Sequence, residues 1–232
     1  MRMLATDAIA PAEEERVYFR KVFAWMALAL AVTGGVSGAI GHSQRALHAL
    51  LTGGGGWVFI GCIVIEFVLV AGLVGLVQHM DTFEAAATFL AYAALNGVTL
   101  SVIFAVYTTK SIFATFLVTA GMFAVLALVG YTTNVDLTKW GSFLLMALVG
   151  QLIGLVVNLF WLNQTLYWVT TATGVLLFSA LTAYDVQRLK RYEVVGQDEQ
   201  AVAKSAIVGA LALYLDFVNL FLYLLRLFGR RR

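Results

Sequence analysis

The sequence predicts an all-α, polytopic membrane protein, a bundle of seven transmembrane helices. Of its 232 residues, 61% are hydrophobic and only 12% charged, and the mean hydropathy is +0.88. A soluble globular domain of this length is far less apolar. The apolar residues gather in runs of about 20, each long enough to cross roughly 30 Å of hydrocarbon as a helix. The single proline, Pro11, precedes the first run, so proline breaks none of the predicted spans.

Three segments follow one another along the chain. Residues 1–21 are charged and lack the apolar centre of a secretory signal peptide, so we expect a cytoplasmic N-terminal tail. Residues 22–229 form the seven-helix transmembrane domain, and residues 230–232 form a basic C-terminal tail. The predicted spans are 22–41, 56–77, 84–107, 111–131, 140–160, 165–185 and 205–228.

The first span and the last two spans have the most clearly marked limits. The first begins directly after Arg20 and Lys21, and the sixth ends where the apolar run gives way to the basic residues 188–191. The last, 205–228, is one apolar run without glycine or proline at its middle, which favours a full crossing. A re-entrant hairpin, which would return the C-terminal arginines to the cytoplasm, stays open as the alternative.

Glycine pairs predict where helices approach closely. Gly34 with Gly38, and Gly150 with Gly154, lie four residues apart, a spacing at which small residues let two membrane helices pack together.

Charge favours a cytoplasmic N-terminus by a narrow margin. With that orientation, nine of the 15 cations lie on the inner side, in agreement with the positive-inside rule. The other six would lie outside: Arg45, Lys110, Arg226, Arg230, Arg231 and Arg232. The net charge of +2 is too small, on a chain this apolar, to indicate nucleic acid as a partner.

The sequence gives no reason to expect an enzyme or a bound cofactor. Cys62 is the single cysteine, which excludes an internal disulfide and a thiolate metal cluster. The three histidines are predicted to lie on different sides of the membrane, so a shared metal site is not expected. No nucleophile or metalloprotease motif occurs.

Two acids at membrane depth are the main functional candidates, because a carboxylate at a helix centre costs about 2.5–3.5 kcal/mol on insertion. Asp185 is expected near the cytoplasmic end of the sixth span, whereas Asp216 is expected about 16 Å into the last. A tilted helix, or a last helix that begins late and partly outside the hydrocarbon, would be needed to bring them together. If they meet, both cannot ionise easily, and the coupled pair would act as a proton-controlled switch. Alternatively, the acids only hold helices together, and Asp216→Asn would mainly lower stability.

Other polar residues lie within the spans. Asparagine and glutamine in membrane helices usually form hydrogen bonds between helices. The amides in question are Asn96, Gln151, Asn158 and Asn219, of which Asn219 is also an auxiliary candidate beside Asp216.

Several stretches resemble the Bax inhibitor-1 family, also called the transmembrane Bax inhibitor motif family, and most closely its bacterial branch. The resemblance covers nearly the whole chain from about residue 18 and is most specific over residues 211–229. It is carried by residues 18–26, by 96–101 with 104–107, by 130–133 with Asp136 and Leu137, and by the segments around Asp185 and Asp216.

The resemblance implies a fold and an activity. Family members are seven-helix proteins in which six helices wrap a central last helix, and the bacterial branch implies a pH-sensitive calcium leak in the inner (cell) membrane. By motif, Asp185 and Asp216 would share a proton and close the cytoplasmic end of the path. When freed, their oxygens would attract Ca²⁺, the permeant ion, as transient ligands.

One departure concerns the second span, which contains no Arg or Lys where a family member has a latching arginine. It offers Glu66 instead, either as a third acid on an ion path or as a protonated side chain hydrogen-bonded in the bundle. Arg188, three residues after Asp185, is a candidate replacement partner or a positive-inside anchor.

A second function stays open from the same resemblance. Some bacterial members bind and restrain a membrane-bound quality-control protease, and that role would depend on the N-terminal tail. Deleting residues 1–21 should then abolish the partner-based activity and leave a leak intact. The sequence specifies neither the ion selectivity nor the oligomeric state.

Overall fold

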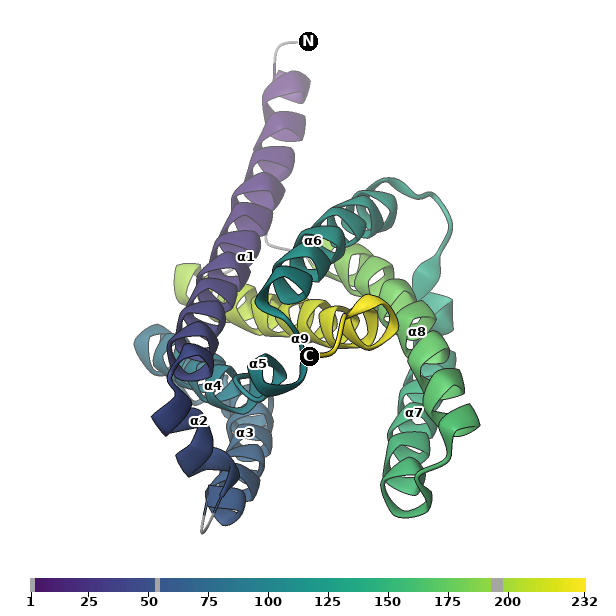
Figure 1. Ribbon diagram of the computed structural model, residues 1–232. Coiled ribbons are helices and arrows are strands. Elements are labelled where there is room, and N and C mark those ends of the chain that lie inside the picture. The colour runs from purple at the N-terminus through teal and green to yellow at the C-terminus, as the bar shows by residue number, and fades with distance from the viewer. Residues whose placement is uncertain (1–2, 53–54, 193–197) are drawn as a thin grey trace. The chain divides into compact units, whose positions relative to one another are not determined.

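A computed structural model of the chain describes residues 3–52, 55–192 and 198–232, so residues 1–2 of the expected tail lie outside it. The all-α prediction is confirmed, since the described residues form helices and no named strand (Figure 1). The elements are α1 (Met3–His42), α2 (Gln44–Leu51), α3 (Gly55–Leu76), α4 (Thr82–Leu100), α5 (Ile103–Val106), α6 (Thr109–Thr132), the 3₁₀ helix η1 (Leu137–Trp140), α7 (Gly141–Trp161), α8 (Gln164–Lys190) and α9 (Glu199–Phe228).

Seven helical stretches in the described chain are long and apolar enough to cross a membrane, and each overlaps one predicted span. They are Glu13–His42, Gly55–Leu76, Thr82–Val106, Thr109–Thr132, Leu137–Trp161, Gln164–Lys190 and Glu199–Phe228. Three predicted boundaries were wrong. Helix α1 begins at Met3, within the expected tail and 19 residues before Val22. Helix α8 continues to Lys190, and α9 begins six residues before Ser205. Charged residues such as Lys190 and Lys204 end an apolar run without ending a helix, since lysine is a good helix former.

Side-chain caps define where several helices begin. At the start of α4, the Asp81 carboxylate accepts from the Glu84 N–H at 2.7 Å, and the Glu84 carboxylate accepts from the Asp81 N–H at 3.0 Å. This reciprocal capping box satisfies two donors that would otherwise lack partners. At the start of α8, Asn163 Oδ1 accepts from the Leu166 N–H at 2.9 Å. Asn163 and Leu162 form the two-residue turn that joins α7 to α8.

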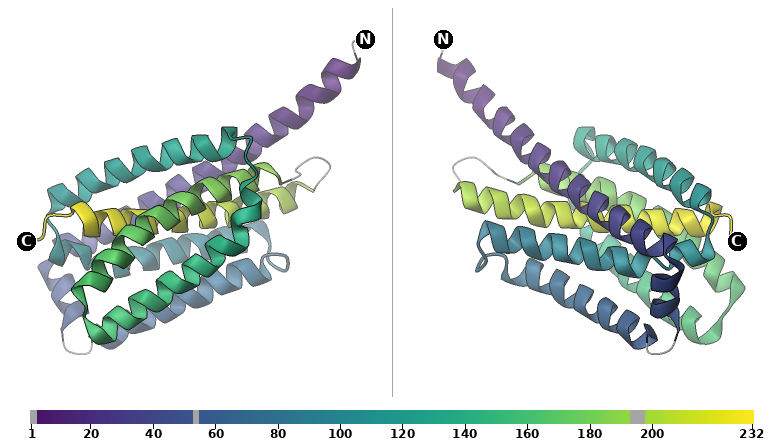
Figure 2. Two further views of the ribbon diagram at one scale, coloured as in Figure 1. Left: turned by 90° about the vertical axis from the view of Figure 1, so that its right-hand side faces the viewer. Right: turned by 60° about the vertical axis from the view of Figure 1, so that its left-hand side comes forward.

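The chain divides into two compact units. The first contains α1 to α5 and the beginning of α9, up to Tyr214, and in it α4 packs against both α1 and α3. The second contains α6, η1, α7, α8 and the rest of α9, from Leu215. In this second unit α8 packs against α6 and α7, and Figure 2 shows α7 and α8 running beside each other.

Helix α9 is the most buried of the seven spans. In its most apolar window 72% of the residues are buried, compared with at most 39% in any other span. This agrees with the expected central last helix. The helix is unbroken over 30 residues, about 45 Å, which excludes the re-entrant hairpin.

Close helix contacts occur at glycines other than most of those predicted. A Cβ added at Gly34, Gly38 or Gly150 would meet no atom within 4 Å, and of the predicted glycines only Gly154 faces a near neighbour. The close approach occurs instead at Gly130 of α6, where a Cβ would collide with the Ala183 carbonyl oxygen of α8. Spacing places small residues on one helix face, but it does not say whether that face meets another helix.

Candidate functional site

The second unit brings Asp185 and Asp216 together. Asp185 lies on α8, five residues before its end, and Asp216 lies on α9, 17 residues after its start. Their carboxyl groups lie close enough to interact with each other. Phe178 lies seven residues before Asp185 on α8, and Tyr223 lies seven residues after Asp216 on α9. Their rings stack with centroids 5.7 Å apart, so the two helices run antiparallel.

Helix α9 begins at Glu199, six residues earlier than the predicted span and 17 residues before Asp216.

Asp216 is the more buried of the two aspartates. Asp216 is only 4% exposed, and its Oδ2 is buried with no hydrogen-bond partner among the described residues. A carboxylate only accepts hydrogen bonds, so a bond between two carboxyl groups requires a proton on one of them. Without that proton, two negative charges would lie in contact where little water can screen them.

Neighbouring helices close tightly around this end of α8. Gly130 of α6 abuts the backbone of Ala183, and a Cβ at Gly141 of α7 would lie 2.6 Å from the Tyr184 hydroxyl. Both contacts lie within two residues of Asp185 along α8.

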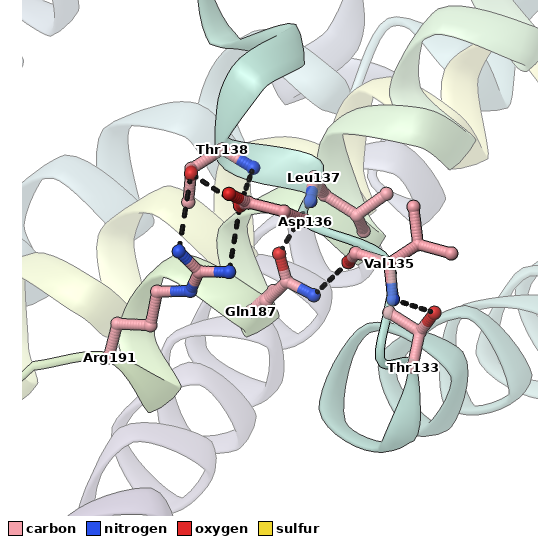
Figure 3. Close-up of polar contacts among 7 residues, drawn as sticks. All are labelled: Thr133, Val135, Asp136, Leu137, Thr138, Gln187 and Arg191. Atoms are coloured by element: carbon pink, nitrogen blue, oxygen red, sulfur yellow. Dashed lines mark hydrogen bonds and ion pairs between the residues drawn. The ribbon is translucent and has the colours of Figure 1, made fainter.

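A loop is fastened over the end of α8, as Figure 3 shows. Gln187 accepts from the Leu137 N–H and donates to the Val135 carbonyl, both at 2.8 Å. Arg191 forms an ion pair with Asp136 at 2.7 Å and donates to Thr138 Oγ1 at 3.3 Å. We call this set of contacts, from Gln187 and Arg191 to residues 135–138, the α8 clamp.

The clamp includes a carboxyl that differs from the buried pair. Asp136 lies outside the spans, and its pKa is held below the ordinary value of 3.8, chiefly by the hydrogen bond from the Thr138 hydroxyl and also by the Arg191 charge. Asp136 is one of the residues that carry the family resemblance, but the sequence alone assigned it no role. The available signal was the pair of hydrogen-bonding side chains at Gln187 and Arg191, four residues apart on one helix face.

The auxiliary candidates differ in their relation to the aspartate pair. Arg188 is exposed, and its charge lies near enough to act on Asp185. Asn219 instead donates to the Leu215 carbonyl of its own helix at 2.8 Å. Glu66 belongs to the first unit, where it accepts from Thr99 Oγ1 at 2.8 Å and from Asn96 Nδ2 at 3.4 Å. Glu66 is thus hydrogen-bonded within the bundle, as one of its two predicted roles requires.

Of the remaining amides, Gln151 forms the expected hydrogen bonds between helices and Asn158 does not. Gln151 donates to the Thr170 carbonyl at 2.6 Å and to the Tyr223 hydroxyl at 2.8 Å, which confirms a bond between helices. For Asn158 this prediction was wrong, since its Oδ1 accepts from the Asn163 N–H at 2.9 Å in the turn after α7. Over the described residues, no three His, Cys, Asp or Glu side chains converge as a metal site.

Comparison with known proteins gives a consistent result over the whole chain. Residues 15–232 match the family described as inhibitor of apoptosis-promoting Bax1. The chain is 42% identical to the inner membrane protein YbhL of Escherichia coli K12, an alignment that covers 100% of this chain and 99% of that protein. It is 41% identical to an uncharacterized protein of Borreliella burgdorferi, over 93% of this chain and 92% of the relative.

Proposed function

Since this chain belongs to the Bax inhibitor-1 family and is a multi-pass inner membrane protein, we propose that it is a pH-sensitive cation leak, closed by the contact between Asp185 and Asp216. The observation that supports the proposal is the proximity of two carboxyl groups inside a bundle of membrane helices. Calcium is the ion that we assign, because hard divalent cations prefer carboxylate oxygens.

Loss of the shared proton is the proposed opening step. In the closed state the proton bridges α8 and α9, and the close contacts at Gly130 and Gly141 hold the surrounding helices against α8. After deprotonation, the repulsion between adjacent carboxylates loosens the contact, and the freed oxygens attract a cation. The leak should therefore increase as pH rises through the titration of the pair.

Calcium flux into liposomes that hold the purified protein tests this mechanism between about pH 5 and 8. Wild type should show a flux that increases with pH. Asp216→Asn and Asp185→Asn should each flatten the profile, because an asparagine amide donates to the remaining carboxylate at any pH.

Ser179→Ala is the matched control on α8, since its hydroxyl bonds only the Val175 carbonyl of its own helix at 2.6 Å. This variant should keep the wild-type pH profile. A folded wild type with no flux, or with flux independent of pH, would contradict the leak. Deletion of residues 1–21 would then test the protease-restraining role. If Asp216→Asn lowers thermal stability and leaves flux unchanged, the acids only hold the helices together.

A further inference from the structure

The second unit has a pocket at the end where α7 meets α8. The α7–α8 turn, the end of α9 and the tail after it enclose about 550 Å³. Two guanidinium groups, from Arg226 and Arg231, line it together with the amide side chains of Asn163 and Gln164. All of these groups are hydrogen-bond donors, and the guanidiniums are always charged.

The tail that carries Arg231 is held in place by the start of α6. The Thr108 N–H donates to the Arg230 carbonyl at 3.1 Å, and the Arg230 N–H donates to Ser111 Oγ at 2.9 Å. Tyr107 and Arg231 form an antiparallel bridge. The Arg231 guanidinium then donates to the Tyr167 hydroxyl at 3.1 Å, so this cation is positioned before any ligand arrives.

Acidic side chains are missing from this end. Within residues 107–192 and 215–232 the only acids are Asp136, Asp185 and Asp216. The first two lie near the opposite end of α8, and Asp216 is ten residues, about 15 Å, before Arg226. Among the described residues, none of the cations at this end forms an ion pair. Those cations are Lys110, Arg226, Arg230, Arg231 and Arg232.

Two further features increase the positive potential. Helix α8 starts at Gln164, and the N-terminus of a helix carries a partial positive charge. A neighbouring pocket of about 420 Å³ is lined by Lys110 and Arg230. The pocket therefore suits an anion with several acceptor oxygens, for which paired arginines provide directed hydrogen bonds.

An apolar, exposed segment leads into the pocket. Leu162 lines the pocket, and the three residues before it are Leu159, Phe160 and Trp161. Each of the four is between 72% and 85% exposed, and we call residues 159–162 the apolar rim. Leu162, at φ 40°, is the only non-glycine residue at positive φ in the described chain, and this strained conformation occurs at the rim of the cationic pocket. A rim of this kind suits hydrocarbon next to the anion, as a phospholipid supplies.

We infer that this pocket binds the phosphate group of an anionic phospholipid, with Arg226 and Arg231 on the phosphate oxygens and the acyl chains along residues 159–162. A free phosphate ion shares the headgroup chemistry and would use the same arginines, but it would leave the apolar rim uncovered. The site is independent of the aspartate pair, so it stands whether or not the protein conducts ions.

Lipid retention by the purified full-length protein tests this assignment. Native mass spectrometry in detergent, with phosphatidylglycerol or phosphatidylcholine titrated, should show at least about tenfold preference for phosphatidylglycerol. Arg231→Gln should reduce this preference about tenfold, as expected for the loss of one charge-assisted contact. Arg232→Gln, the same change one residue further on and outside the pocket lining, should keep it.

Circular dichroism and gel filtration confirm that each variant is folded, and Arg231→Lys should recover part of the preference. Equal retention of the two lipids by wild type, or an Arg232→Gln variant as weak as Arg231→Gln, would overturn the site. In a second arm of the experiment, the melting temperature is measured with inorganic phosphate at millimolar concentration in place of the lipid. If phosphate alone raises the melting temperature as much as phosphatidylglycerol does, the ligand is the free ion and the lipid assignment is wrong.

Discussion

Asp216 and Asp136 belong to the same unit, but their carboxyl groups have different surroundings. Asp216 is buried and has another acid, Asp185, as its neighbour. Asp136 lies in a loop, and it pairs with Arg191 at 2.7 Å. A negative charge is disfavoured beside a second carboxyl group and favoured beside an arginine. The proposed function therefore assigns the proton exchange to the pair and not to Asp136.

We predict that Asp136→Asn leaves the pH response of the flux unchanged. The pKa of Asp136 is lowered in the folded state, so its contribution to stability is present above the ordinary value of 3.8 and is lost as pH falls through the lower folded value. Between about pH 5 and 8 this side chain does not titrate.

The variant should accordingly lower the melting temperature by a similar amount at every pH in that range, as measured by thermal unfolding in detergent. Its flux midpoint should coincide with that of wild type. A shifted midpoint would show that the α8 clamp contributes to pH sensing.

Contacts between elements depend on a few positions where backbones meet. Helices α6 and α8 approach at Gly130 so closely that no side chain fits, and the contact lies two residues from Asp185. Helices α8 and α9 meet through the Phe178–Tyr223 stack and the aspartate pair. Any change that separates α6 from α8 should therefore also disturb the environment of Asp185.

Gly130→Ala should destabilise the protein by about 1–3 kcal/mol, because the added methyl group collides with the backbone carbonyl of Ala183, which cannot rotate away. The matched control is Gly121→Ala on the same helix, where the new Cβ meets no atom within 4 Å. The control should be neutral, or more stable by up to about 1 kcal/mol through helix propensity. Thermal or denaturant unfolding in detergent measures both. Equal losses at the two glycines would contradict the contact.

The described residues contain seven helices that are long and apolar enough to cross a membrane. With all seven as crossings, successive loops alternate between its two sides. The loop of the α8 clamp then lies on the side of the N-terminus, and the α7–α8 turn lies on the other. The lipid site would thus be in the leaflet opposite the N-terminus.

A cysteine-labelling experiment checks this topology. With Cys62 replaced by alanine, Thr165→Cys near the α7–α8 turn should react with a membrane-impermeant maleimide in intact cells. Lys139→Cys, next to the clamp, should react only after permeabilisation, if the N-terminus is cytoplasmic as the charge distribution favours. The reverse pattern would invert the orientation, and equal labelling would contradict the odd number of crossings.

The sequence by itself determined the fold class, the number of spans and the two central acids. These are local properties, because the length of an apolar run is matched to the thickness of the bilayer and a buried charge is costly wherever it lies. Helix ends were predicted less well, since charged helix formers such as Lys190 and Lys204 continue a helix after its apolar part has ended.

The tertiary structure decided which of these residues meet. Asp185 and Asp216 are 31 positions apart, and their contact depends on the register of α8 against α9. Close packing occurs at Gly130 and not at Gly34 or Gly150. Two of the C-terminal arginines that depart from the positive-inside rule, Arg226 and Arg231, line a pocket with an apolar rim. Periodicity and hydropathy describe one helix at a time, whereas register and pocket shape arise from the fit of side chains between helices.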